Sequence, residues 1–171
     1  MEYTKTERIS KPVSRVGLGT WAIGGLMWGG TSESESIYTI LAAMDKGITL
    51  IDTAPAYGFG KSEEIVGKAL AEYDRREDVL LATKCGLEWD EKGNIFRNSS
   101  QKRIRQEIND SLERLQVDYI DIYQVHWPDP MVPFEETAEA LGELYEGDYI
   151  RAIGVSNYYP NQMTAFRKAA P

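Results

Sequence analysis

Residues 48–54 read ITLIDTA, and this short stretch decides the fold that the rest of the chain is expected to adopt. Its β-branched and apolar side chains are typical of a strand buried in a parallel sheet. Four other segments have the same character: residues 15–21, 79–85, 119–126 and 150–157. Counted from one start to the next, a strand therefore recurs every 31 to 40 residues. This spacing leaves room for a helix after each strand.

Helical patterns occupy the intervals between these strands. The clearest lies at residues 101–116, where apolar side chains recur every three or four positions and charged side chains fill the opposite face. Other helix starts are marked by a serine or proline followed by glutamates, because carboxylates suit the positive end of the helix dipole. These starts are Ser32, Ser62 and Pro133, and the helix that begins at Ser32 is expected to end at Lys46 and Gly47.

The alternation of strands and helices predicts parallel strands joined by right-handed crossovers. Such a sheet is either doubly wound or part of an eight-fold barrel, and the periodicity alone does not choose between the two. Residues 86–98 form a polar insertion that is expected to overhang the strand ends as a loop or hairpin. Residues 1–14 are expected to form a small hairpin at the bottom of a barrel.

Composition narrows the class of protein. The 171 residues suit one domain, and 42% hydrophobic residues are enough for a packed core. A formal charge of −8 without a basic run argues against a nucleic-acid partner. No apolar leader or stretch of roughly 20 apolar residues is present, so no membrane partner is expected and the protein is predicted to be soluble and cytoplasmic. A single cysteine, Cys85, and a single histidine predict no internal disulfide and no metal site.

Polar side chains fall repeatedly at the carboxyl ends of the predicted strands. Asp52 closes the second strand, Lys84 the third and His126 the fourth, and the fifth ends at Ser156 and Asn157. Each residue taken singly has a structural explanation as a turn cap, a snorkelling lysine or a hydrogen-bonded core histidine. Active sites of parallel α/β folds are built at this edge, where the loops converge. Their coincidence therefore predicts a site.

A mechanism can be written for these residues together with Tyr57, which lies in the loop just beyond Asp52. A phenol is a sluggish acid at neutral pH unless a neighbouring cation stabilises its anion. Lys84 would supply that cation, and Asp52 would keep it charged and oriented. His126 as a neutral imidazole would hydrogen-bond a substrate carbonyl. The set suits carbonyl reduction, with Tyr57 giving the proton and a nicotinamide giving the hydride.

Several motifs resemble the signature of the aldo-keto reductase family, in the family's order and over essentially the whole chain. They are GLGTW at 17–21, IDTAPAYG at 51–58, KSEEIVG at 61–67, ATK at 82–84, DYIDIYQVH at 118–126 and IGVSN at 153–157. The sequence around residues 28–30, 87–90 and 126–130 is similar to that of bacterial general-stress members of the family.

The resemblance implies an α/β fold of the (β/α)8 TIM-barrel type and NADPH-linked reduction of a small carbonyl compound, an aldehyde or ketone. It implies a catalytic tetrad of Asp52, Tyr57, Lys84 and His126, in which Tyr57 is the general acid. It also implies NADP contacts at Gly19, Thr20, Trp21, Asp52, Ser156 and Asn157.

A complete barrel has eight βα units and typically about 250 residues. The chain is therefore expected to be a single domain, residues 1–171, that is incomplete at its C-terminus and holds about the first five units. An open sheet exposes its edges and inner face, so self-association or a complementing C-terminal fragment is expected. A non-catalytic interaction module or an inactive truncated relative on the same fold stays open as an alternative. A doubly wound hydrolase or phosphate-binding protein is a weaker one, because neither a nucleophile elbow nor a phosphate loop is present.

Overall fold

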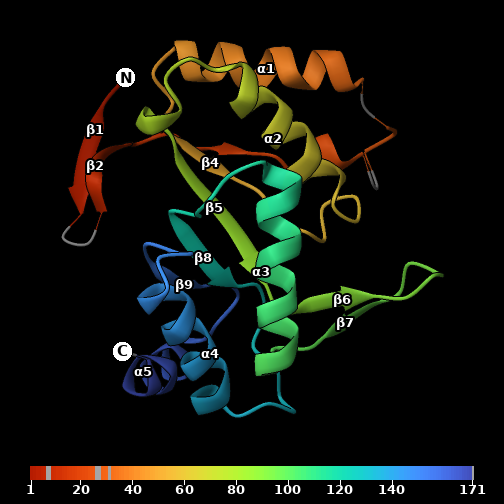
Figure 1. Ribbon diagram of the computed structural model, residues 1–171, viewed down its shortest axis with the longest axis vertical. Coiled ribbons are helices and arrows are strands. Elements are labelled where there is room, and N and C mark those ends of the chain that lie inside the picture. The colour runs from red at the N-terminus through yellow and green to blue at the C-terminus, as the bar shows by residue number, and fades with distance from the viewer. Residues whose placement is uncertain (7–8, 26–27, 31, 171) are drawn as a thin grey trace.

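A parallel sheet of five strands forms the centre of the computed structural model, which describes all residues except 7–8, 26–27, 31 and 171 (Figure 1). The spatial order of the strands follows the chain. They are β3 (Leu18–Gly19), β4 (Leu50–Asp52), β5 (Leu80–Cys85), β8 (Ile122–Val125) and β9 (Ile153–Val155). All five predicted strands are present, although β3 is much shorter than predicted.

Helices follow every strand and pack against one another in chain order. They are η1 (Ala22–Gly24), α1 (Glu33–Asp45), α2 (Lys61–Glu72), η2 (Arg76–Asp78), α3 (Gln101–Leu115), α4 (Phe134–Glu146) and α5 (Pro160–Ala169). A doubly wound sheet reverses its strand order at one point, whereas this sheet never does. Successive right-handed crossovers then place every helix on one face, as in the wall of a barrel. The structure therefore selects the barrel-type arrangement that periodicity left open.

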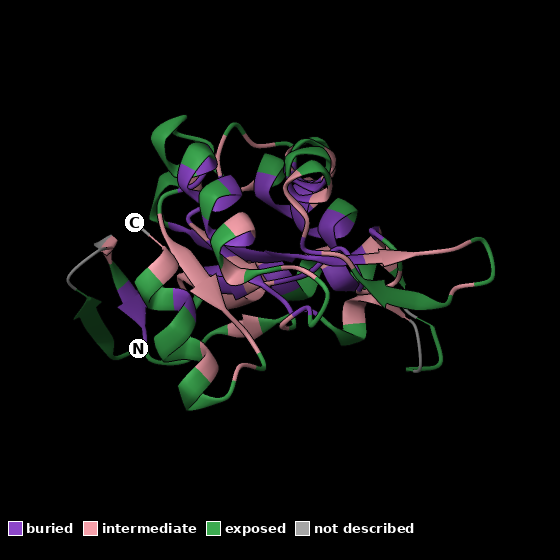
Figure 2. Ribbon diagram, turned by 90° about the horizontal axis from the view of Figure 1, so that it is seen from below, coloured by how far each residue is buried: buried purple, intermediate pink, exposed green. Residues whose placement is uncertain are grey.

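The hydrophobic core lies between this face of the sheet and the helices, and Figure 2 shows the buried residues in purple where the two layers meet. Ile51, Leu81 and Tyr123 point from the sheet into this core and are fully buried. Burying an apolar side chain such as that of Ile51 or Leu81 contributes roughly 1.5–3 kcal/mol. The other face of the sheet alternates with it along the strands and carries Asp52 and Gln124, which are only partly buried.

Most predicted helix ends are confirmed. Ser32 caps α1 by accepting a hydrogen bond from the Glu35 amide, and the helix ends at Lys46, before Gly47 at φ +89°. The predictions for α3 and for Pro133 before α4 also hold. The prediction for Ser62 was wrong. The residue that precedes α2 as its N-cap is Gly60, two residues earlier, because the Ser62 hydroxyl is buried and donates to the carbonyl oxygen of Thr20 instead.

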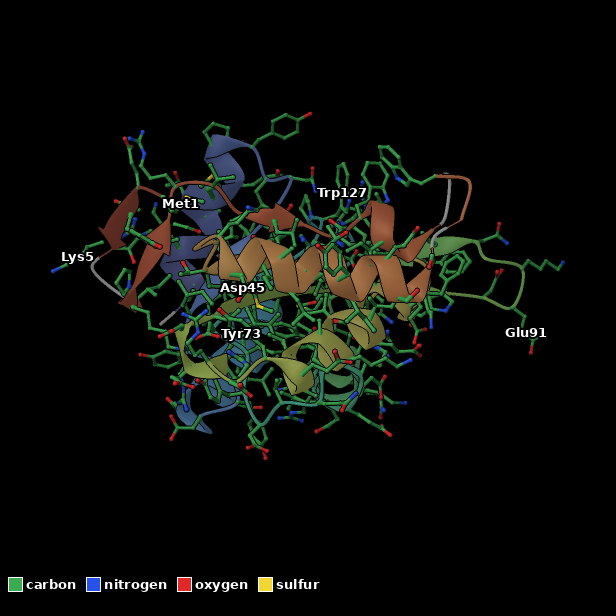
Figure 3. The ribbon with its side chains drawn as sticks, turned by 90° about the horizontal axis from the view of Figure 1, so that it is seen from above. Met1, Lys5, Asp45, Tyr73, Glu91 and Trp127 are labelled. Carbon is green, nitrogen blue, oxygen red and sulfur yellow. The ribbon has the colours of Figure 1, made fainter. Side chains whose placement is uncertain are left out.

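Two hairpins extend from the sheet at opposite sides of the molecule. The N-terminal hairpin, β1 (Tyr3–Thr6) with β2 (Ile9–Ser14), lies at the amino ends of the strands, where the Ser14 amide donates to Thr49 Oγ1. The predicted insertion forms the hairpin β6 (Leu87–Trp89) with β7 (Ile95–Arg97). Figure 3 shows Glu91 at the far tip of this second hairpin and Lys5 on the first. Both predicted hairpins are confirmed, except that residues 7–8 of the first lie outside the described part. Among the described residues, no helix is both long and apolar enough to span a bilayer.

Candidate active site

Lys84 is the centre of a polar cluster at the carboxyl ends of the strands. Only 5% of this residue is exposed, so its ammonium needs partners to offset the loss of water. Its Nζ donates to Asp52 Oδ2 at 2.8 Å and to the Thr53 carbonyl oxygen at 2.8 Å. The parallel pairing of β4 with β5 brings these residues together, since Asp52 lies opposite Ala82. The predicted lysine–carboxylate pair is therefore formed in the structure.

Tyr57 lies over this pair. Its ring centroid is 5.0 Å from Lys84 Nζ, and the His126 ring meets it edge-on with the centroids 5.9 Å apart. The Trp21 ring lies on Tyr57 at 6.3 Å. The structure thus brings together a phenol, an ammonium and an imidazole from the loop after β4, from β5 and from the end of β8.

His126 is anchored and uncharged. Its backbone amide donates to the Cys85 carbonyl oxygen at 2.9 Å, which fixes the chain where β8 ends. Burial, reinforced by the nearby Lys84 ammonium, lowers the pKa of His126 to about 4. The imidazole is therefore neutral at pH 7 and can donate one N–H, as the sequence-based mechanism requires.

The residues predicted to contact a cofactor differ in how exposed they are in the structure. Gly19 pairs with Asp52 at the edge of the sheet, and a Cβ at this position would project into open space. Ser156 and Asn157 follow β9, and the side-chain Nδ2 of Asn157 donates to the His126 carbonyl oxygen at 2.9 Å. Thr20 is fully buried and donates its hydroxyl to the Asp52 carbonyl oxygen at 3.0 Å. The role of Thr20 as a cofactor contact stays a prediction, and the structure adds a hydrogen bond by which Thr20 supports the backbone of Asp52.

Gln124 also contacts the cluster, and the sequence analysis missed it. Its Nε2 donates to Asp52 Oδ1 at 3.3 Å. The alternation of strand faces puts Gln124 on the same face as His126, two residues further on, but it does not indicate that the glutamine side chain reaches Asp52.

A close contact between two backbones fixes the loop that carries Tyr57. A Cβ built on Gly24 would lie 2.5 Å from the Tyr57 carbonyl carbon, and one built on Gly58 would lie 2.1 Å from the Gly24 carbonyl oxygen. Gly58 also has φ +67°, a conformation that side chains disfavour. The short helix η1 and the Tyr57 loop therefore touch through glycines on both sides, a contact that sequence motifs alone did not reveal.

Replacing Gly58 with alanine is expected to lower the free energy of unfolding by roughly 1–3 kcal/mol, because the new Cβ meets backbone that cannot rotate away. Gly29 has φ +80°, but none of the described residues lies within 4 Å of a Cβ built there, so Gly29→Ala is the matched control and is expected to cost only the roughly 1–2 kcal/mol of the left-handed conformation. Urea unfolding of both variants measures the difference. Equal losses would show that η1 and the Tyr57 loop separate without cost.

Buried carboxyl groups lie behind β5, on the helix side. Glu63 on α2 accepts hydrogen bonds from Thr83 Oγ1 at 2.6 Å and from Arg114 Nε at 2.7 Å. Glu107 on α3 accepts from the Gly86 amide at 2.8 Å, and burial raises its pKa to about 8. These carboxyl groups hold the strand whose opposite face presents Lys84. Within the described residues, no group of three or more acidic, histidine or cysteine side chains is arranged to hold a metal ion.

Comparison with known proteins gives a consistent result. Residues 15–171 match the model of the aldo/keto reductase family. The aldo-keto reductase YhdN of Bacillus subtilis is 62% identical over 171 residues, which cover 100% of this chain and 51% of that protein. The NADH-specific methylglyoxal reductase of Escherichia coli is 48% identical over 159 residues, covering 85% of this chain and 48% of that protein.

Solved structures agree with these sequence matches. The glycerol dehydrogenase AKR11B4 from Gluconobacter oxydans superimposes with a TM-score of 0.90 at 52% identity, covering 99% of this chain and 52% of that one. An aldo-keto reductase from Klebsiella pneumoniae in complex with NADPH gives a TM-score of 0.79 at 32% identity, covering 99% of this chain and 55% of that one. The chain thus spans about half the length of the relatives it matches.

Proposed function

The chain belongs to the aldo/keto reductase family, and we propose that it supplies the acid–base half of an active site that reduces aldehydes and ketones with NADPH. The observation that carries this proposal is the position of Lys84. Its ammonium contacts the Asp52 carboxylate and lies 5.0 Å from the centre of the Tyr57 ring. A buried cation beside a phenol is the arrangement that makes the phenol a better acid.

Each residue of the tetrad has a separate task. Tyr57 donates a proton to the oxygen of the carbonyl group as that oxygen gains negative charge. Lys84 stabilises the phenolate that remains, and Asp52 keeps the ammonium in place. His126, neutral because its pKa is about 4, donates a hydrogen bond toward the same oxygen without competing with Lys84 as a second cation.

The cofactor contacts of this chain lie around the tetrad. Gly19 leaves open space beside Asp52, which fits the close approach of a planar ring, and Ser156 and Asn157 provide polar groups beside His126. We propose that these three residues hold the nicotinamide end of the nucleotide. When bound, the reduced nicotinamide supplies the hydride for carbonyl reduction.

The proposal is tested on a joined protein, in which residues 1–171 are fused to the C-terminal half of the Bacillus subtilis relative. We expect NADPH to quench its tryptophan fluorescence saturably, since Trp21 is 50% exposed beside Tyr57, and we expect NADPH-dependent loss of an added aldehyde. Titration with NADH in parallel decides the nucleotide preference. A folded joined protein that binds neither nucleotide, or binds but reduces no aldehyde, would contradict the proposal. The 171-residue chain alone is assayed beside it.

A further inference from the structure

Gln124 lies on the inner face of the sheet, where it reaches the carboxylate that holds Lys84. The pairing of β5 with β8 places it beside Lys84. Its side chain extends back toward Asp52, and its Nε2 donates to Asp52 Oδ1 at 3.3 Å while Lys84 Nζ donates to Asp52 Oδ2 at 2.8 Å. The two oxygens of one carboxylate are thus bound from two different strands.

Asp52 needs this second contact because it is not held by burial. Its side chain is 36% exposed, whereas the ammonium that it pairs with is almost completely buried. A carboxylate bound through one oxygen can rotate about its side-chain bonds toward water and leave the ammonium with less compensation. A donor on the other oxygen opposes that rotation.

The neighbouring strand leaves space for this glutamine. Gly154 on β9 pairs with Gln124, and a Cβ at Gly154 would lie 2.9 Å from Gln124 Cγ. Any larger residue at this position would push the glutamine side chain from its place. Gly154 on β9 therefore leaves the space that the side chain of Gln124 on β8 occupies, and the position of the glutamine depends on this glycine.

The chemistry of an amide suits this position better than that of a charged side chain. A lysine or arginine here would compete with Lys84 for the carboxylate, and a glutamate would repel Asp52. Glutamine donates a hydrogen bond without adding charge. We propose that Gln124, accommodated by Gly154, is a positioning residue that orients Asp52 toward Lys84 and so keeps the ammonium beside Tyr57. Its effect on catalysis rests on the proposed function, but its effect on Lys84 does not.

The first experiment measures how fast an acylating reagent, N-hydroxysuccinimidyl acetate, modifies Lys84 in the 171-residue chain at fixed pH, by peptide mass spectrometry. Asp52→Asn sets the scale for a lysine that has lost its carboxylate. Gln124→Leu is expected to raise the rate by about three- to tenfold, because one charge-assisted hydrogen bond to Asp52 is lost. Gly154→Ala is expected to raise it in the same direction.

The matched control is Gln106→Leu. Gln106 makes the same kind of hydrogen bond, from Nε2 to Asp110 Oδ1 at 2.7 Å, but on the exposed face of α3. In this variant the reagent is expected to modify Lys84 at the same rate as in the parent chain. If Gln124→Leu also labels at the parent rate, the positioning role is overturned, whatever the protein does with carbonyl compounds.

A second measurement uses the joined protein and Gln124→Glu, which is nearly the same size as the parent residue. Two adjacent carboxyl groups share protons, so the new glutamate is expected to donate to Asp52 at low pH and to repel it at high pH. Turnover should approach the parent value near pH 5.5 and fall at least about tenfold below it near pH 8, with nucleotide affinity unchanged. A pH profile parallel to that of the parent would overturn the proposal. Altered labelling in a joined protein that reduces no aldehyde would instead uphold the positioning role and reject the proposed function.

Discussion

Replacing Tyr57 with phenylalanine is expected to slow carbonyl reduction by the joined protein by about 10²- to 10⁴-fold, because the variant has lost the proton donor. The phenyl ring that remains can keep the contacts of the parent ring, at 5.9 Å from the His126 ring and 6.3 Å from the Trp21 ring. The site should therefore keep its shape, and the loss should appear in kcat while the affinity for NADPH stays unchanged. Steady-state kinetics together with the fluorescence titration separate the two quantities.

The matched control for this variant is Tyr38→Phe. Tyr38 lies on α1 with 74% of its surface exposed, so removal of its hydroxyl should alter neither turnover nor binding. Turnover by Tyr57→Phe within a few-fold of the parent rate would exclude the phenol as the acid. A large loss of NADPH affinity would show instead that the hydroxyl group helps to shape the nucleotide site.

The fold was predictable because the strands are rich in β-branched and apolar residues and alternate with helical patterns at a regular spacing. The exception is the first strand, where the prediction covered residues 15–21 and the structure has only Leu18–Gly19. Arg15 pairs its amide with the Glu2 carbonyl oxygen in the N-terminal hairpin, so it cannot join the sheet. Hydrogen bonding between segments far apart in sequence decided this boundary, and local patterns carry no record of it.

The candidate site was predictable to the extent that it depends on strand ends. Parallel strands bring their carboxyl ends to one edge, so Asp52, Lys84 and His126 could be grouped before their distances were known. Thr20 and Gln124 could not be assigned in the same way. One is turned into the protein and the other reaches diagonally across the sheet, and both outcomes depend on side-chain direction within a register that the sequence does not specify.

Because of Glu107, the free energy of unfolding is expected to depend on pH, an effect that the sequence motifs did not indicate. It is buried on α3, where its Oε2 accepts from the Gly86 amide. Arg103 approaches the other oxygen only to 3.5 Å. Burial therefore dominates and raises the pKa of Glu107 from 4.5 to about 8, despite the nearby guanidinium. At neutral pH the folded chain holds a proton that the unfolded chain releases.

The sign of the effect follows from that proton. Between pH 4.5 and pH 8 the folded state binds one proton more at Glu107, so the free energy of unfolding should fall by about 1.4 kcal/mol per pH unit, roughly 5 kcal/mol in all. His126 acts in the opposite direction at lower pH. Its pKa is lowered from 6.5 to about 4, so the unfolded state binds more protons there and stability rises with pH up to 6.5. The contribution of His126 levels off just above pH 6.5, so the interval from pH 6.5 to pH 8 reports mainly on Glu107.

Urea unfolding at the two ends of that interval is expected to show a loss of roughly 1–1.5 kcal/mol for the parent chain and no loss for Glu107→Gln. The glutamine keeps an acceptor for the Gly86 amide but has no proton to release. Glu113→Gln, on the exposed side of the same helix, should keep the slope of the parent. Equal slopes in the parent and in Glu107→Gln would assign the titration to another group. A parent without a slope would mean that Arg103 keeps Glu107 ionised, and the carboxyl group behind β5 would then act as half of a buried ion pair.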